Sequence, residues 1–263
     1  KFIFQHAEEV LPGGAREIIA TGILDDVDEI FGLHIAGGSP VGSAASRIGA
    51  FTASSDTFQI KLRGKGTHGS TPDLGIDLVV VGSEIVSALQ TIVSRSITPL
   101  QPAVITVGQF NIGTAANIIA HEGFMSGTVR AVNKEVRKLL EERIYAVVEN
   151  IAKLYHAEVE INYIHGYSSV INEFNAYQTG VKAVKKVIGD EGYYDMPNPQ
   201  MGAEDFSAYT DIIPGCFFMI GGGDGDTYDF FNHHPKFKVS EEALLVGSKI
   251  HLQIILDLLK KGD

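Results

Sequence analysis

The sequence predicts an α/β protein of two domains, in which a host domain with a parallel or mixed sheet is interrupted by an inserted unit. Two observations support this prediction. The middle of the chain contains strands and helices in the order β-α-β-β-α-β, which is enough for an independent unit. The flanks also alternate strands and helices, but neither flank has enough strands to close its own core. We therefore expect a host domain from 1–52 and 166–263, and an inserted domain at 53–165.

Hydrophobic periodicity defines the elements of the inserted domain. Residues 58–63 alternate apolar and polar side chains like a half-exposed strand, whereas 76–95 has apolar residues at helical spacing. Asn133 is placed to cap the amino end of a second helix. This order predicts the ferredoxin-like arrangement, a four-stranded antiparallel sheet with both helices on one face. The other elements are strands at 103–110 and 123–130, the helix from 133 to about 155, and a strand at 157–164.

The flanking segments have the pattern of an α/β domain. An apolar run at 1–5 predicts a buried parallel strand, and residues 216–220 predict another. The remaining expected elements are a helix at 14–21, a strand at 28–34, a Gly- and Ser-rich stretch at 37–46, a helix at 174–188, a glycine-rich loop at 221–226 and a helix at 241–260.

Charge and composition exclude several classes of protein. The net charge of −11 and the isoelectric point near 5.2 argue against nucleic acid or an anionic membrane as a partner. Cys216 is the single cysteine, which excludes a disulfide framework or a Cys-rich zinc site within the chain. We expect its thiol to be buried and inert, in a protein of the reducing cytoplasm. No segment approaches the roughly 20 apolar residues that span a bilayer.

Two adjacent carboxylates, Glu8 and Glu9, follow the first apolar run. Open α/β sheets bind their ligands at the carboxyl ends of the strands. Neighbouring residues on an extended chain point to opposite sides, so one carboxylate could hold a metal ion while the other faces water or substrate. Taken alone, such a pair is more often solvated at the start of a loop. Its interpretation therefore depends on the other residues that could join it.

Two histidines occur where these carboxylates would need partners. His34 ends an apolar strand, and His233 follows the glycine-rich loop. Imidazole and carboxylate together suit zinc, manganese or nickel, although a histidine at a strand end is often satisfied by ordinary hydrogen bonds. We expect structural or surface roles for the histidines without such a context, which are His6, His121, His156, His165 and His251.

The inserted domain has its own group of polar residues. His68 follows two glycines in the stretch 64–77, and Asn117 and Arg130 lie further along the domain. An arginine can bind a carboxylate through two hydrogen bonds, while Asn and His can stabilise an oxyanion. The structural alternative is that these residues have no role in binding. The glycines would then form a turn, Asn117 would cap a loop, and Arg130 would be a solvent-exposed side chain on a strand.

Seven motifs, in order along nearly the whole chain, resemble the amino-acid amidohydrolase branch of the aminoacylase and carboxypeptidase type of di-metal peptidases. That branch includes hippurate hydrolase, indole-acetyl-amino-acid hydrolases and N-acetyldiaminopimelate deacetylase. The resemblance implies a catalytic α/β domain interrupted by a ferredoxin-like lid that also forms a homodimer. The motifs are FQHAEE, GLHI, GKGTHGSTPDLGID, GTAANIIA, SGTVR, MGAEDF and NHHPKF.

The resemblance assigns roles to residues of the host domain. It implies that Glu8 is the general base and that Glu9, His34 and His233 are metal ligands. In the motif NHHPKF the family ligand is the residue two positions before the proline, which selects His233 and leaves His234 as second choice.

The resemblance also assigns roles in the inserted domain. His68 resembles the lid histidine that reaches the partner subunit's site and stabilises the tetrahedral intermediate. Asn117 and Arg130 resemble lid groups that contact substrate, a small N-acyl amino acid or peptide. Glu204 lies in the family motif MGAEDF near the site, and its role stays open.

The chain also departs from the family. It has no counterpart of the upstream His-Gly-Cys-Gly-His-Asp type motif, and His6 replaces the usual proline before Ala-Glu-Glu. Glu9, His34 and His233 cannot complete a two-metal site, which needs a shared bridge and several ligands per ion. We therefore expect two divalent ions (Zn, Mn, Ni or Co) in the intact family member, and an inactive fragment with little or no metal in this chain.

Two alternatives to an amidohydrolase or deacetylase are kept open. One is a non-catalytic homologue that dimerises or binds a ligand without a competent metal site. The other is a dipeptidase or aminopeptidase of the same wider family. For the dimer, an exposed edge strand such as 103–110 is the physical indication in the sequence.

Overall fold

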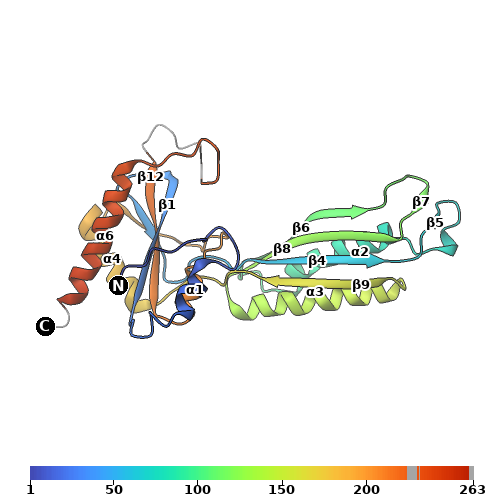
Figure 1. Ribbon diagram of the computed structural model, residues 1–263, viewed down its shortest axis with the longest axis horizontal. Helices are drawn as coiled ribbons and strands as arrows, with labels where there is room; N and C mark the ends of the chain where they lie inside the picture. Colours follow the sequence, from blue (N-terminus) through green and yellow to red (C-terminus); the bar gives the residue numbers. More distant parts are fainter. Residues whose placement is uncertain (224–229, 231, 261–263) are drawn as a thin grey trace. The chain divides into compact units, whose positions relative to one another are not determined.

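The chain folds into two compact units in the computed structural model, which describes residues 1–223, 230 and 232–260 (Figure 1). Unit 1 is formed by Lys1–Thr52, Ser169–Gln200 and Glu204–Asp263, and unit 2 by Ala53–Ser168 with Met201–Ala203. The structure contains mixed and antiparallel sheets, so the predicted α/β class is confirmed.

Unit 1 is built on a four-stranded mixed sheet in the order β1-β12-β2-β11. β1 pairs with β12 in parallel, β12 with β2 antiparallel, and β2 with β11 in parallel. A short antiparallel pair, β3 and β10, lies outside this sheet. The strands are β1 Ile30–Pro40, β2 Ala44–Ser46, β3 Gly49–Ala50, β10 Ile171–Asn172, β11 Tyr193–Asp195 and β12 Gly215–Gly223.

The helices of unit 1 contribute to two separate apolar clusters, which meet β12 through alternate residues. Cys216 and Phe218 belong to a cluster with side chains of α4 and α6. Phe217 belongs to the other cluster, with side chains of α1 and α5. A strand buried by both sets of side chains explains the continuous apolar run at 216–220. The helices are α1 Gly14–Ala20, α4 Phe174–Ile188, α5 Ser207–Thr210 and α6 Glu241–Leu259.

The prediction of a strand at 1–5 is wrong, because these residues have no strand partner in the described chain. Phe2 and Phe4 are exposed, and only Ile3 packs against a core cluster. Apolar composition favours a strand, but a strand also needs a neighbour for its backbone groups. The next residue, Gln5, is instead held through its side chain by Asp205 and Tyr209.

Other expected boundaries shift by a few residues. β1 continues to Pro40 through the Gly- and Ser-rich stretch, because its backbone pairs with β12 regardless of side-chain size. Residues 221–223 of the expected glycine-rich loop are the end of β12, while 224–226 lie outside the described residues.

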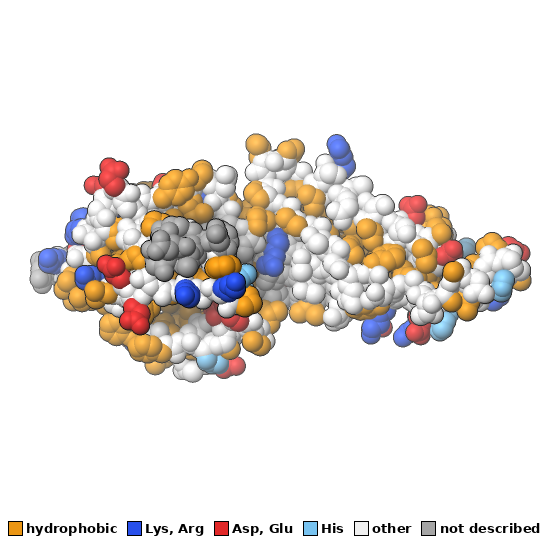
Figure 2. Space-filling model, turned by 90° about the horizontal axis from the view of Figure 1, so that it is seen from above, with side chains coloured by type: hydrophobic (Ala, Val, Ile, Leu, Met, Phe, Trp, Pro, Cys, Tyr) orange, Lys and Arg blue, Asp and Glu red, His pale blue; other side chains and the backbone are white. Residues whose placement is uncertain are grey.

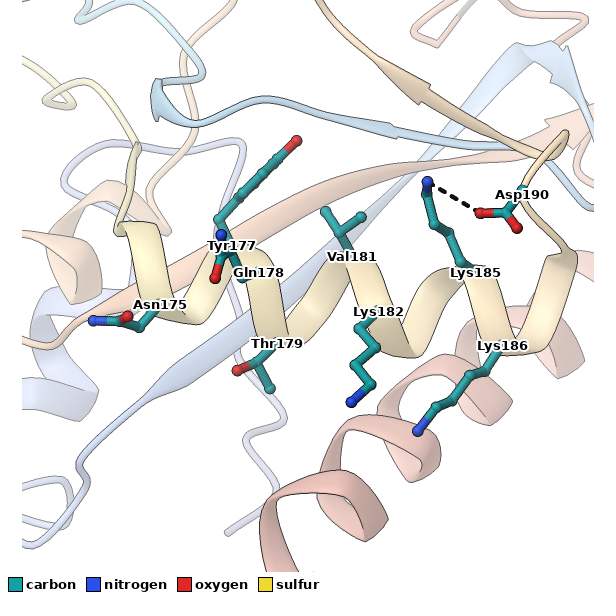
Figure 3. A pocket seen from close by; sticks show the side chains of 9 residues that line it. All are labelled: Asn175, Tyr177, Gln178, Thr179, Val181, Lys182, Lys185, Lys186 and Asp190. Carbon is teal, nitrogen blue, oxygen red and sulfur yellow. Dashed lines mark ion pairs between the residues drawn. The ribbon is translucent and has the colours of Figure 1, made fainter. Parts of the chain in front are cut away.

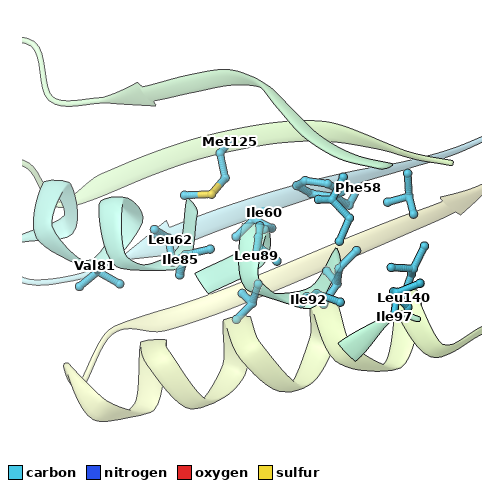
Figure 4. Close-up of a cluster of buried hydrophobic side chains, with 14 of the residues drawn as sticks. Phe58, Ile60, Leu62, Val81, Ile85, Leu89, Ile92, Ile97, Met125 and Leu140 are labelled. Carbon is cyan, nitrogen blue, oxygen red and sulfur yellow. The ribbon is translucent and has the colours of Figure 1, made fainter. Parts of the chain in front are cut away.

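Unit 2 has one antiparallel sheet in the order β6-β8-β4-β9, with α2 and α3 packed in a single core against it (Figure 4). Phe58, Ile60 and Leu62 alternate into this core from β4, as the sequence predicts. Small added elements include the antiparallel pair of β5 and β7 and the turn η1 Pro72–Leu74. The elements are β4 Asp56–Arg63, β5 Thr67–His68, α2 Leu78–Thr91, β6 Ala103–Ile112, β7 Ile118–Ile119, β8 Glu122–Ala131, α3 Lys134–Leu154 and β9 Glu158–His165.

Capping residues define where the helices of unit 2 begin. The Asp77 carboxylate accepts hydrogen bonds from the backbone of Val79 and Val80, and the Asn133 side chain accepts one from Val136. α2 continues into a π-helical turn, Ile92–Ser96. The expectation that no segment is long and apolar enough to span a bilayer is wrong by length and composition, because Leu78–Ser96 meets both criteria. The buried stripe of this segment packs in the core of unit 2.

On one face of the molecule, the charged side chains of the described residues form no continuous basic area (Figure 2). Figure 2 shows acidic, basic and apolar side chains interspersed on the visible face. This distribution agrees with the net charge of −11 and provides no electrostatic surface for nucleic acid on that face.

Candidate active site and metal centre

Glu8 lies in a tight loop of unit 1 between Gln5 and the start of α1. Within the loop, Val10 N–H donates to Ala7 O and Gly13 N–H donates to Val10 O, at 3.3 and 2.9 Å. α1 then begins at Gly14 without a side-chain cap. The loop therefore carries Glu8 and Glu9 on turns of the backbone and not on the end of a strand.

Three carboxylates of unit 1 converge in this region. Ligand oxygens of Glu8, Glu204 and Asp205 all lie within 4.8 Å of one another. Glu204 and Asp205 are buried, while Glu8 is half-buried. Among the described residues, this is the group of three or more potential ligands close enough to share one ion.

The electrostatics of this group indicate an excess of negative charge. Burial, followed by the charge of Glu8, raises the pKa of Glu204 to about 8. Burial, followed by the charges of Glu9 and Asp205, also raises the pKa of Glu8. Carboxylates that repel one another in a desolvated site favour either a bound proton or a bound cation.

His233 and Glu9 form the second part of the site. The Nε2 atom of His233 lies 3.7 Å from Oε1 of Glu9, and both side chains are exposed. His233 has a positive φ of 73°. The structure therefore brings together two of the three ligands that the resemblance implies.

His234 is engaged elsewhere. Its ring stacks on Phe230 with a centroid distance of 4.5 Å, and its Nδ1 accepts a hydrogen bond from the backbone N–H of Lys236. These contacts support His233 as the first choice between the two neighbours.

His34 lies on β1 and is oriented by its own backbone. Its Nδ1 atom is 2.9 Å from the carbonyl oxygen of Ile35. Because a carbonyl can only accept, Nδ1 carries the proton of the neutral ring and Nε2 keeps a lone pair for a ligand. His34 does not belong to the close group of three carboxylates, so its role as a metal ligand stays a prediction.

His68 and Asn117 are neighbours in unit 2. The strands that carry His68 and Ile118 pair directly, and Gly69 N–H donates to Asn117 O at 2.8 Å. Ser70 N–H donates to Nδ1 of His68, which leaves the proton of the neutral ring on Nε2. The exposed His68 side chain can therefore present an N–H donor. A hollow of about 600 Å³ lies beside this pair, and its lining includes Gly69, Gly113, Ala116, Ile118 and Ile119.

Arg130 is separated from this pair within unit 2. β5 and β7 lie beyond the Glu122 end of β8 (Figure 1), whereas Arg130 lies near the opposite end. The strand from Glu122 to Arg130 is roughly 27 Å long at about 3.4 Å per residue. One copy of unit 2 therefore does not bring Arg130 together with His68 and Asn117.

A second hollow in unit 1 lies along α4 (Figure 3). Its lysines include Lys185, which pairs with Asp190 at 3.1 Å, and Lys186, which pairs with Asp257 at 2.5 Å. These ion pairs already neutralise much of the local charge. We assign no ligand to this hollow.

Sequence reasoning missed Asp205 and left the role of Glu204 open. Both residues follow Gly202 and Ala203 and precede α5. Adjacent acidic residues are usually exposed, so a buried pair could be recognised in the sequence only through the apolar residue Phe206 that follows.

The residues present fit a divalent metal ion. Oxygen ligands from Glu8, Glu204 and Asp205 converge within 4.8 Å, and a cation would relieve the repulsion that raises the pKa of Glu204. Glu9 and His233 add a further carboxylate and an imidazole. Carboxylate with imidazole is a donor set that zinc and manganese accept.

The fold is that of an α/β protein. Its site combines several carboxylates with a histidine, which is a set of side chains typical of sites that bind divalent metal ions. The Peptidase family M20/M25/M40 matches residues 1–257, and the chain belongs to this family.

Individual relatives agree with this assignment. The chain is 41% identical to YhaA of Bacillus subtilis, which carries the name of an amidohydrolase, over 94% of this chain and 63% of YhaA. It is 36% identical to the N-acetylcysteine deacetylase of the same organism, over 99% of this chain and 66% of that enzyme. The crystal structure of B. subtilis YxeP, a dinuclear metal binding peptidase of the M20 family, matches with a TM-score of 0.76 and 33% identity, over 98% of this chain and 65% of YxeP. The chain thus spans about two thirds of the length of these relatives.

Proposed function

We propose that the whole protein hydrolyses the amide bond of N-acyl amino acids with the help of divalent metal ions. The observation that carries this proposal is the half-buried Glu8 beside Glu204 and Asp205, where burial and the neighbouring charges raise the pKa of Glu8 above its ordinary value. A general base works best when its pKa is close to the operating pH. The similarity to an N-acetylcysteine deacetylase supports an N-acyl amino acid as the substrate class.

In the proposed reaction, Glu8 is the proton carrier. Its carboxylate accepts a proton from water, the hydroxide oxygen bonds to the acyl carbon, and the C–N bond then breaks. Glu8 returns the proton to the leaving amine, so the products are a carboxylic acid and an amino acid. Glu9, His34 and His233 would hold the metal, and Glu204 and Asp205 would add negative charge beside it. Two divalent ions bound there, as in YxeP, would supply Lewis acidity and lower the pKa of bound water.

Unit 2 provides the remaining proposed roles. The Nε2–H of His68 would donate to the oxyanion of the tetrahedral intermediate, with Asn117 beside it. Arg130 would bind the carboxylate of the amino-acid part through two hydrogen bonds. A substrate of two or three residues extends only roughly 7–10 Å. Groups that contact one substrate from both ends of β8 must therefore belong to two copies of the chain.

This separation supports a homodimer as part of the proposed function. β6 is an edge strand without a charged residue, whereas the opposite edge strand, β9, contains Glu158 and Glu160. Charges on an edge discourage pairing with another chain, so β6 is the edge we propose for dimerisation. Thr106→Lys should convert a dimer to a monomer in sedimentation velocity, and Asn162→Lys on β9 should not. Equal behaviour of the two variants would rule out this edge.

The catalytic proposal is tested with the whole protein and a panel of N-acetyl and N-benzoyl amino acids and free dipeptides. Glu8→Gln should lower kcat at least 100-fold, since general-base catalysis contributes roughly 10²–10⁴-fold, and bound metal measured by mass spectrometry should be retained. Full activity of Glu8→Gln would remove Glu8 as the base. Turnover of free dipeptides alone would favour the aminopeptidase or dipeptidase alternative, and no turnover would favour a binding protein.

We also propose the cytoplasm as the location of the protein. The single cysteine is buried, and the chain has a net negative charge. Both features suit a reducing compartment with no attraction to anionic membranes.

A further inference from the structure

Asp205 contacts both ends of the loop that carries Glu8. Its Oδ2 atom accepts a hydrogen bond from Nε2 of Gln5 at 2.6 Å and another from the backbone N–H of Ala15 at 3.1 Å. Gln5 precedes the loop and Ala15 lies in the first turn of α1. Asp205 is 2% exposed, so these hydrogen bonds form away from bulk water, where hydrogen bonds to a charged acceptor are stronger.

Asp205 also contacts the middle of the loop through its backbone. The backbone N–H of Asp205 donates a hydrogen bond to the Glu8 carboxylate. One residue therefore makes contact before the loop, at Glu8 and after the loop. This arrangement couples the orientation of the Glu8 carboxylate to the position of Asp205.

Two neighbouring residues determine how the loop contacts Asp205. Tyr209 O–H donates to Oε1 of Gln5 at 2.7 Å, which leaves the amide nitrogen of Gln5 to face Asp205. Gly13 has a φ of 81°, and a Cβ atom on this residue would lie 2.5 Å from Oδ2 of Asp205. The loop can approach Asp205 this closely because residue 13 has no side chain.

We propose that Asp205 is a positioning residue, which holds the loop of residues 6–13 so that the Glu8 carboxylate keeps its place in the active site. The role of Glu8 rests on the proposed function, whereas the anchoring of the loop stands on the hydrogen bonds alone. A displacement of about 1 Å in a catalytic group can lower a rate roughly 100-fold. A residue that never touches substrate can therefore control kcat through Glu8.

Asn and Ala at position 205 separate positioning from the effects of charge. Both side-chain hydrogen bonds end on the same oxygen, Oδ2, so the amide oxygen of Asp205→Asn can accept both. In the whole, metal-loaded protein we expect kcat of Asp205→Ala to fall roughly 100-fold with KM changed little. Asp205→Asn should stay within about fivefold of the wild type, because it keeps the geometry and loses only the charge. Asp190→Ala serves as the control, since this exposed carboxylate pairs with Lys185 and, among the described residues, not with the loop that carries Glu8.

Hydrogen exchange gives a readout that needs neither substrate nor metal. The backbone amides of residues 7–15 should exchange about tenfold faster in Asp205→Ala, as expected for the loss of hydrogen bonds to a charged acceptor. Exchange in Asp205→Asn and Asp190→Ala should match the wild type. If Asp205→Ala fails to fold, Gln5→Ala removes one of the two side-chain contacts and should speed exchange in the same segment.

The outcomes are distinct. Loss of kcat in Asp205→Asn equal to that in Asp205→Ala would overturn positioning and indicate that the charge of Asp205 acts, as in a metal ligand. Unchanged exchange and unchanged kcat in Asp205→Ala would also overturn it. A wild-type protein without amide hydrolysis, combined with faster loop exchange in Asp205→Ala, would refute the proposed function while supporting the anchoring of the loop.

Discussion

Asp56 is the most completely bonded carboxylate in unit 2. Its side chain is fully buried, and its oxygens accept hydrogen bonds from Arg137, Tyr163 and the backbone N–H of Gly166. Arg137 binds both oxygens in a bidentate pair, and it also donates to Gly166 O. The network joins the start of β4 to α3 and to the end of β9, so it contributes to stability through three elements.

Arg137→Ala should lower the free energy of unfolding by about 3–5 kcal/mol, because it leaves the Asp56 carboxylate buried without its charged partner. Urea unfolding measures this loss. Arg143→Ala is the matched control, since Arg143 lies on the same helix with an exposed side chain, and it should change stability by less than about 0.5 kcal/mol. Equal effects of the two substitutions would mean that the pair with Asp56 contributes little.

Glu204 should make the stability of the metal-free chain depend on pH. Its pKa is about 8 in the folded protein and near the ordinary 4.5 in the unfolded chain. Between these values the folded state binds more protons, so stability should fall as pH rises from about 5 to 8. The melting temperature recorded with a chelator should show this fall. Glu204→Gln should flatten it, and an unchanged slope would exclude Glu204 as a source.

The residues of the candidate site were predicted to different extents. Glu8, Glu9 and His233 stand in recognisable motifs, and the structure brings Glu9 and His233 within 3.7 Å. Asp205 also stands in a motif, MGAEDF, but the motif does not reveal its role, because that role arises from hydrogen bonds to Gln5 and Ala15, which are 200 and 190 residues away. Local sequence patterns do not show which residues, far apart in the chain, come into contact after folding.

At the scale of elements, periodicity located most helices and strands correctly because each is long enough to repeat its pattern. β4 and β8 alternate buried and less buried residues over eight and ten positions, and β9 alternates exposed and half-buried residues over its first seven. The short strands β2, β3, β5, β7, β10 and β11 were not predicted. Two or three residues contain no measurable period, and such strands form only where the fold supplies a partner.

The amino end of α3 allows a direct test of whether a single capping residue determines where a helix begins. The Oδ1 atom of Asn133 accepts a hydrogen bond from Val136 N–H at 2.7 Å. Asn133→Ala should cost about 1 kcal/mol of unfolding free energy, whereas Asn133→Asp should keep the cap. Thermal unfolding followed by circular dichroism distinguishes the two. Equal stability of both variants would show that packing of α3, and not its cap, determines where the helix begins.

At the scale of the whole molecule, each unit has its own hydrophobic core. The core of unit 2 draws all its residues from between Phe58 and Tyr163, whereas unit 1 assembles two clusters from segments at both ends of the chain. A unit whose core comes from one continuous segment does not need the rest of the chain for its apolar burial.

A fragment of residues 53–168 should therefore fold alone. It should unfold cooperatively in urea and give a dispersed amide NMR spectrum. Leu89→Ala, which removes a fully buried side chain of this core (Figure 4), should lower its stability by about 2–5 kcal/mol. A fragment without a cooperative transition would show that unit 2 depends on residues outside this range.

The sequence by itself determined the α/β class, the periodic helices and strands, the cap at Asn133, and the motif residues that point to amide hydrolysis. These features depend on neighbours within a few positions, where propensity and periodicity act. The tertiary structure decided that residues 1–5 form no strand, that Glu204 and Asp205 join Glu8, and that Arg130 lies far from His68 within one copy. Each of these depends on the order of strands in a sheet and on which distant segments share a core. The reason is that a buried side chain or a backbone hydrogen-bonding group can find its partner anywhere along the chain.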